Sequence, residues 1–295
     1  MNPLKGFWSR EGGGRVNIAG AVRGSKGDMP EDVRIPCGKC IGCRLDKARD
    51  WATRCVHEAS MHSVSCFTTF TYDDDHLPPD YSVSVRELQL LMKRLRKSYG
   101  VMRFFGVGEY GPSTRRPHYH VLLFGFRPDD GLLLKTGRNG DPVYASAQLS
   151  KVWPFGFTSF GEVTHQSAGY VARYALKKFT GPDAPAVYRL CHPITGAAVE
   201  QAPEFARMSL RPGIGYEWLK RFECDVYPSK FVVVDGRKRP VPQAYKRRLA
   251  EEKRGAWLDK LAEEFPETSP EGERRLADRE EVLKLRAARL GREEL

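Results

Sequence analysis

Apolar residues recur along this chain at the two spacings that distinguish helices from strands. Residues 43–61 and 166–179 place apolar side chains at helical spacing among charged and polar ones, which predicts two helices that each bury one face. A third helix is predicted from Val85 to Gly100, because Ser84 and Glu87 form a capping box directly before its apolar repeat.

Four stretches rich in aromatic and β-branched residues predict strands. They cover residues 66–72, 102–110, 118–126 and 153–160. A loop with Gly111, Pro112 and Pro117 joins the middle two, which predicts a hairpin. The order over residues 45–179 is then α β α β β β α. This order favours an α+β fold of the ferredoxin-like kind, an antiparallel sheet with helices on one face and the other face free.

The remaining patterns divide the chain into four parts. Residues 1–35 are rich in glycine without a period and predict a flexible arm. Residues 36–180 form the predicted domain, and residues 181–240 are expected to complete or flank it. Residues 241–295 are rich in Glu, Arg, Ala and Leu at helical spacing and predict a helical tail. No phosphate-binding loop of the type G-x-x-x-x-G-K-[ST] occurs, which argues against a helicase module.

The charge balance points to a polyanionic partner. The chain has 295 residues, with 48 Lys and Arg against 37 Asp and Glu, so its net charge is +11. A basic protein of this kind favours nucleic acid or an anionic membrane face. No apolar run approaches the roughly 18 residues of a spanning helix, and Met1–Gly14 has no signal core. The chain is therefore expected to act in the compartment where it is made, without a membrane partner.

Three of the seven cysteines lie close together as Cys37, Cys40 and Cys43. This C-x-x-C-x-x-C run indicates a reducing compartment and allows either a structural zinc site or three ordinary thiols in a loop. Zinc needs a fourth ligand, and no spacing decides among the candidates, which are Cys55, His57 and Cys66.

His118 and His120 stand two residues apart in a predicted strand, so their imidazoles share one face. If the hairpin loop spans residues 110–117, Glu109 lies opposite His118 and its carboxylate reaches the same face. Two imidazoles and one carboxylate with open positions suit a catalytic Mg²⁺ or Mn²⁺. The alternative is a pair of half-exposed histidines without a metal.

Tyr170 and Tyr174 are four residues apart in a predicted helix, so their phenols stack on one face. Lys177 and Lys178 continue that face by a turn. Other residues already form an apolar face, which favours exposed tyrosines over packed ones. A phenol is a weak nucleophile unless a metal or an ammonium group offsets the charge that develops in its attack on a phosphodiester.

These segments resemble the HUH endonuclease superfamily of rolling-circle replication initiators, most closely those of gokushovirus-like microviruses. The resemblance covers residues 36–180 through PCGKCIGCR, FTTFTYDD, GVGEYG, RPHYHVLLFG and YVARYALKK, in that order. The histidine pair precedes the tyrosine helix, as in replication initiators and unlike conjugative relaxases. The Y-x-x-x-Y spacing is similar to that of the two-tyrosine branch.

The resemblance implies a nickase and ligase that cuts single-stranded origin DNA in the host bacterial cytoplasm. It would leave a 3′-OH for a host polymerase and a 5′-phosphotyrosyl link, and it would work with a host helicase. Tyr170 and Tyr174 would be the nucleophiles, His118 and His120 the ligands of Mg²⁺ or Mn²⁺, and Lys177 or Lys178 the assisting cation. Glu109 as third ligand combines this analogy with the hairpin geometry.

Two other functions fit parts of the sequence. One is a non-enzymatic single-stranded DNA-binding protein with a zinc clip, in which the basic run 237–248 contacts phosphates. Its stacking platforms would be Trp51, Trp153, Phe155 and Phe157. It leaves the histidine pair, Glu109 and the paired tyrosines without a role. The other is a transposase or plasmid initiator that uses the same chemistry.

Overall fold

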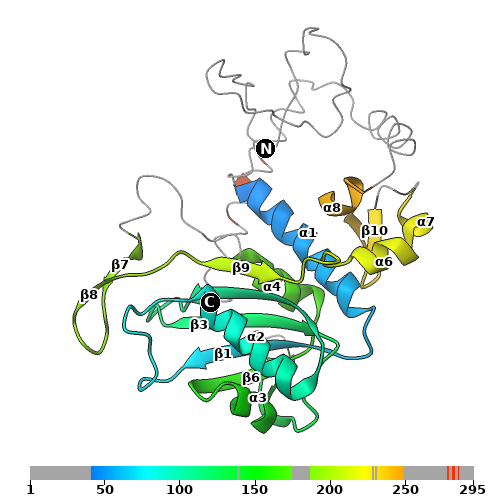
Figure 1. Cartoon of the computed structure of the whole chain (residues 1–295). Helices are drawn as coiled ribbons and strands as arrows, with labels where there is room; N and C mark the ends of the chain where they lie inside the picture. Colours follow the sequence, from blue (N-terminus) through cyan, green and yellow to red (C-terminus); the bar gives the residue numbers. More distant parts are fainter. Residues whose placement is uncertain are drawn as a thin grey trace.

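The computed structural model describes residues 41–137, 140–174, 187–227, 229, 231–248, 278, 281–282 and 285. Its centre is a seven-stranded antiparallel sheet in the order β4-β5-β6-β1-β3-β2-β9 (Figure 1). The strands are β1 (Ser65–Tyr72), β2 (Arg103–Tyr110), β3 (Pro117–Phe124), β4 (Leu132–Thr136), β5 (Pro142–Ala145), β6 (Gly156–Gly161) and β9 (Phe205–Met208).

Four helices accompany this sheet: α1 (Ile41–Ala59), α2 (Val85–Tyr99), α3 (Ala147–Val152) and α4 (His165–Tyr174). The predicted α+β class, the hairpin and the elements expected from the strongest patterns are confirmed. Strands β4 and β5 and helix α3 were not predicted. All five residues of β4 are exposed, so this strand lacks the alternation that marks a half-buried strand.

Helix α2 packs on one face of the sheet. Ser84 caps it, accepting hydrogen bonds from the backbone N–H groups of Arg86 and Glu87, as the capping box predicts. The core on this side includes buried leucines of α2, α3 with the fully buried Trp153, and alternate residues of β1 and β3. Leu91 and Tyr119 are both fully buried there.

Helices α1 and α4 pack on the opposite face, so helices lie on both faces and not on one as the sequence suggested. Ala52 and Cys55 of α1 meet Ala168 and Val171 of α4 over buried residues of β2 and β3. Small side chains let the two helices approach each other and the sheet closely. Helical periodicity shows that a helix has a buried stripe, and it does not reveal which face of the sheet receives it.

A small unit follows the sheet and docks on α1 (Figure 1). It comprises α6 (Tyr216–Arg221), α7 (Glu223–Val226), β10 (Phe231–Val234), β11 (Arg237–Pro240) and α8 (Gln243–Lys246), and the short hairpin β7 (Arg189–Cys191) and β8 (Ala198–Glu200) precedes it. Its apolar side chains form a cluster of their own. No helix in the described part of the chain has the length and apolar character needed to cross a membrane. Most of the predicted C-terminal helical tail lies outside the described residues.

His57 of α1 is the centre of the contact with this unit. Its ring stacks on Trp218, with ring centroids 3.5 Å apart, and its Nδ1 lies 3.0 Å from the Tyr245 hydroxyl. Burial, with a smaller contribution from His165, lowers the pKa of His57 from its ordinary value of 6.5 to about 3. The ring is therefore neutral in the folded protein at neutral pH.

This pKa shift predicts a loss of stability in acid. Below pH 6.5 the unfolded chain protonates His57 while the folded chain does not, so the free energy of unfolding falls as the pH drops toward 3. The expected contribution is about 1.4 kcal/mol per pH unit. Urea melts of wild type and His57→Gln between pH 7 and 4.5 should differ in slope by about this amount below pH 6. Equal slopes would show that His57 does not carry the effect.

Candidate active site

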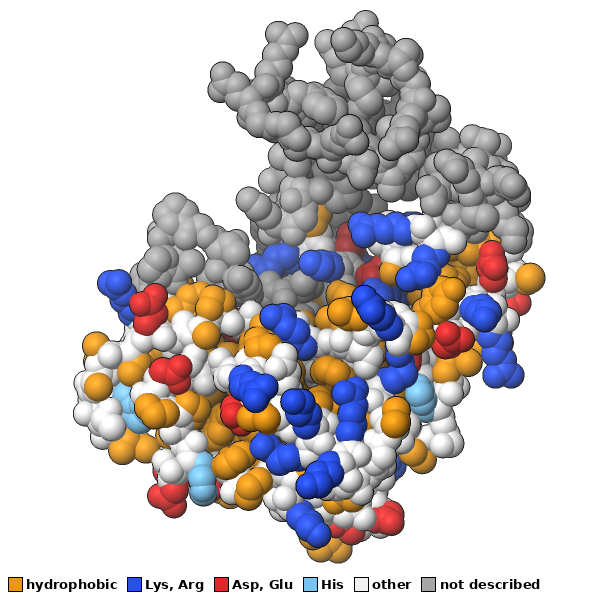
Figure 2. Space-filling model, viewed as in Figure 1, with side chains coloured by type: hydrophobic (Ala, Val, Ile, Leu, Met, Phe, Trp, Pro, Cys, Tyr) orange, Lys and Arg blue, Asp and Glu red, His pale blue; other side chains and the backbone are white. Residues whose placement is uncertain are grey.

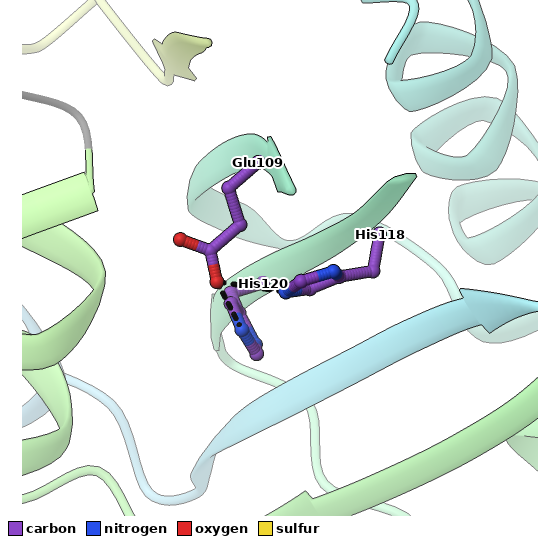
Figure 3. Close-up of side chains that lie close together, drawn as sticks. All are labelled: Glu109, His118 and His120. Carbon is purple, nitrogen blue, oxygen red and sulfur yellow. Dashed lines mark hydrogen bonds and ion pairs between the residues drawn. The ribbon is translucent and has the colours of Figure 1, made fainter. Parts of the chain in front are cut away.

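Three potential metal ligands meet on the hairpin formed by β2 and β3. Glu109 pairs with His118 across the two strands, as the sequence predicts, and His120 follows on the same face. The Nε2 atoms of His118 and His120 each lie 2.8 Å from Oε1 of Glu109 (Figure 3). The ligand atoms of the three residues lie within 4.8 Å of one another, and no second such group occurs among the described residues.

Outer hydrogen bonds orient both imidazoles. Nδ1 of His118 lies 3.1 Å from the carbonyl oxygen of Arg116, and Nδ1 of His120 lies 2.9 Å from Oγ1 of Thr69. A carbonyl oxygen only accepts, so Nδ1 of His118 carries the proton. In the neutral ring its Nε2 is then a lone pair directed at the Glu109 carboxylate, which is the state in which imidazole binds a metal.

The electrostatics of Glu109 also favour a bound cation. Its side chain is 2% exposed, and its buried Oε2 has no hydrogen-bond partner in the described part of the chain. Burial alone raises the pKa of this carboxyl, but the facing imidazoles, His120 first, outweigh it and place the pKa below its ordinary value. Burial lowers the pKa of His120 and Glu109 opposes this. An ionised carboxylate beside neutral imidazoles is a donor set that fits a divalent ion.

Helix α4 brings one of the predicted tyrosines to this cluster. The ring of Tyr170 stands edge-on to His120 with centroids 5.2 Å apart, and Phe67 lies 6.2 Å away on its other side. Tyr170 is half-buried. Tyr174 is the last residue of α4, and its side chain, like Lys177 and Lys178, lies outside the described residues.

A hollow of about 730 Å³ opens beside Tyr170 and His120. Its walls come from β1, β6, α4 and the hairpin of β4 and β5, and they include Thr69, Lys135 and Arg173. The hollow is large enough for part of a nucleotide chain, and it borders the proposed nucleophile and one proposed ligand. The contribution of β4 and β5 to it was not visible in the sequence.

The cysteines predicted to bind zinc remain a prediction. Cys43 lies half-buried in the first turns of α1, and Cys37 and Cys40 lie outside the described residues. The candidates for a fourth ligand have other surroundings: Cys55 is in the core under α1, and Cys66 donates to the carbonyl of Phe126 from the other face of the sheet. Burial raises the pKa of Cys66 to about 12, which disfavours the thiolate that zinc requires.

Two of the four aromatic residues suggested as base-stacking platforms are unsuited to that role. Trp153 is fully buried, and Trp51 packs against Phe105 with centroids 5.0 Å apart. Phe155 is partly buried against the core, and Phe157 is exposed. A bulky aromatic in a strand-rich segment gives the same sequence signal whether it fills the core or lies on the surface.

Thr69 is a site residue that the sequence analysis missed. It lies on β1, opposite His120 on the same face, and its role depends on the pairing of β1 with β3, which no local pattern gives. Thr69→Val is expected to lower the affinity for Mn²⁺ about 10-fold or more, because outer hydrogen bonds hold metal-binding imidazoles in place.

Titration calorimetry with Mn²⁺ tests this expectation. Thr71→Val is the matched control, since Thr71 lies on the same strand and face, opposite His118. In the described part of the chain its side chain makes no hydrogen bond to either histidine. A loss of the same size in both variants would contradict the role assigned to Thr69.

Comparison with known proteins places this site in a family. Residues 65–179, which contain Glu109, both histidines and both tyrosines, match the family model for replication-associated proteins of the ORF2 type. The chain belongs to this family of phage replication-associated proteins. No solved structure gives a significant match.

The relatives are proteins of small phages. The chain is 36% identical over 222 residues to replication-associated protein VP4 of Bdellovibrio phage phiMH2K, over 72% of this chain and 66% of that protein. It is 31% identical over 243 residues to replication-associated protein ORF2 of Spiroplasma virus 4, over 77% and 70% of the two chains. Replication-associated protein ORF4 of Chlamydia phage 1 is 35% identical over 154 residues, 49% of this chain and 38% of the relative.

Proposed function

We propose that this protein initiates rolling-circle replication by nicking single-stranded origin DNA through tyrosine transesterification. The observation that carries the proposal is the position of Tyr170, whose ring lies 5.2 Å from that of His120 at the edge of the hollow. Family membership supports a role in phage replication. The residue types at the site supply the nucleophile and the metal ligands that this reaction needs.

The reaction exchanges one phosphate ester for another. The hydroxyl oxygen of Tyr170 or Tyr174 attacks the scissile phosphorus and loses its proton. The bond from phosphorus to the 3′ oxygen breaks, and that oxygen takes up a proton to become the free 3′-OH. The 5′ phosphate stays on the tyrosine as a diester, so a second exchange can reseal the strand.

Each site residue has a defined part in this scheme. Glu109, His118 and His120 would hold Mg²⁺ or Mn²⁺, which when bound polarises the scissile phosphoryl group. The helix positions the phenols beside that group, and Thr69 and the Arg116 carbonyl hold the imidazoles in orientation. Lys177 or Lys178 would offset the negative charge that develops at the phenol oxygen. Two tyrosines would allow two consecutive exchanges.

The partners follow from the reaction. The substrate is single-stranded origin DNA, the 3′-OH serves a host DNA polymerase, and a host helicase separates the strands, all in the cytoplasm of a bacterial host. The net charge of +11 supports a nucleic-acid substrate. A structural zinc ion at Cys37, Cys40 and Cys43 would fix the start of α1.

A strand-polarity assay tests the proposal. Origin single strands labelled at either end are incubated with wild-type protein and Mn²⁺, Mg²⁺ or EDTA and resolved on a denaturing gel. The proposal predicts protein linked only to the 5′ side of the nick, a free product that a polymerase extends from its 3′-OH, and no nick in EDTA. Tight binding without any adduct would favour the non-enzymatic DNA-binding protein instead.

A further inference from the structure

Helix α2 carries a row of cations on the face of the sheet opposite the metal ligands. Arg86, Lys93 and Lys97 are all exposed. Their spacings of seven and four residues place them along one side of the helix, about 10 and 6 Å apart along its axis. Arg96 is exposed beside them. Figure 2 shows basic side chains gathered over the region of α2.

The edge strand β9 extends this row. Arg207 is exposed and pairs with Gly106 of β2, and Leu88 of α2 packs directly over Gly106. Arg207 therefore projects on the α2 side, where its guanidinium lies 5.6 Å from the ring of Phe205. Arg86, Lys93, Arg96, Lys97 and Arg207 together are called the α2 basic surface below.

The charge of the α2 basic surface is not neutralised within the described part of the chain. None of its five side chains forms an ion pair there. Glu87, the single acidic residue of α2, is half-buried in the first turn, and its presence there belongs to the capping box. Unpaired cations in a line raise the local concentration of a polyanion.

The chemistry of the surface favours nucleic acid over a membrane. A helix that binds a membrane face places exposed large apolar residues beside its cations, and α2 has none among its exposed residues. Its apolar side chains are buried against the sheet. Regularly spaced cations without apolar neighbours suit a phosphate backbone read without regard to sequence.

We propose that the α2 basic surface binds the sugar-phosphate backbone of DNA flanking the segment that is cleaved. This inference rests on the proposed function, because that function supplies a DNA strand longer than the hollow. Leu88 and Leu91 fix α2 to one face, while Glu109 and His120 open on the other. A strand at α2 is therefore a different stretch of DNA from the one at Tyr170, and it would anchor the origin during the two exchanges.

The test compares two triple variants of the full chain. Arg86→Gln/Lys93→Gln/Lys97→Gln removes three charges from the surface, and Lys47→Gln/Lys151→Gln/Arg189→Gln removes three exposed charges from α1, α3 and β7. Fluorescence anisotropy gives the affinity for a 40-nucleotide origin strand from 50 to 200 mM NaCl. Single-turnover adduct formation is measured at saturating DNA.

The α2 variant should lose about two units from the slope of log affinity against log salt, since each phosphate contact with a single strand contributes about 0.7. The control variant should keep the wild-type slope, and both should form adduct at the wild-type rate. Equal slopes in the two variants would overturn the inference, as would a loss confined to the adduct rate. Absence of adduct in wild type would sink the proposed function alone, because the salt slopes decide the α2 basic surface separately.

Discussion

The double variant Tyr170→Phe/Tyr174→Phe is expected to lose nicking altogether, a fall of on the order of 10⁴-fold or more, as when an enzyme loses its nucleophile. Phenylalanine keeps the ring that packs beside His120 and Phe67 and removes only the hydroxyl. Folding and DNA affinity should therefore remain close to wild type. Gel analysis of labelled origin strands with Mn²⁺ measures the adduct, and anisotropy measures binding.

The single variants separate the two phenols. If the tyrosines act in turn, each single variant should still nick but should fail to complete the second exchange, so the adduct accumulates. Tyr144→Phe is a suitable control, because Tyr144 stacks on Phe160 with centroids 5.3 Å apart and lies outside the tyrosine helix. Nicking at the wild-type rate by the double variant would rule out both tyrosines as nucleophiles.

Replacing the ligands should have the second large effect. Glu109→Gln keeps the shape of the side chain and removes its charge, and His120→Ala removes a ligand. Each is expected to lower the affinity for Mn²⁺ by at least 100-fold, because a divalent ion in an open site depends on every protein ligand. Adduct formation at limiting Mn²⁺ should fall in parallel.

Stability distinguishes a metal site from a structural cluster. The Glu109 carboxylate is buried and faces two imidazoles, so removing its charge changes the melting temperature of the metal-free protein modestly. Mn²⁺ should raise the melting temperature of wild type and not that of the variants, since a ligand that binds only the folded state stabilises it. An equal rise in wild type and Glu109→Gln would contradict the assignment.

The candidate ligands could be predicted because their geometry is local. A short loop fixes the register of the β2–β3 hairpin, and the two-residue period of a strand then places Glu109 opposite His118 on the face of His120. The tyrosine spacing is equally local. The approach of Tyr170 to His120 is not local, because it depends on how α4 crosses the sheet.

Other features required information from distant parts of the chain. Thr69 reaches His120 only because β1 pairs with β3, and β9 joins β2 across roughly a hundred residues. The hairpin of β4 and β5 is exposed along its first strand and has no periodic signal. Trp153 gives no sign in the sequence that it fills the core. Periodicity reports burial of a stripe, and pairing and packing decide what that stripe meets.

Peptide mapping of the trapped adduct tests the central claim most directly. After incubation with origin DNA and Mn²⁺, nuclease digestion leaves a nucleotide remnant, and trypsin separates the tyrosines into peptides 152–173 and 174–177 because cleavage follows Lys151, Arg173 and Lys177. The account predicts a remnant phosphodiester-linked to Tyr170 or Tyr174 and to no other residue, and none in EDTA. A remnant on another residue, or a nicked strand with no protein-linked nucleotide, would contradict it.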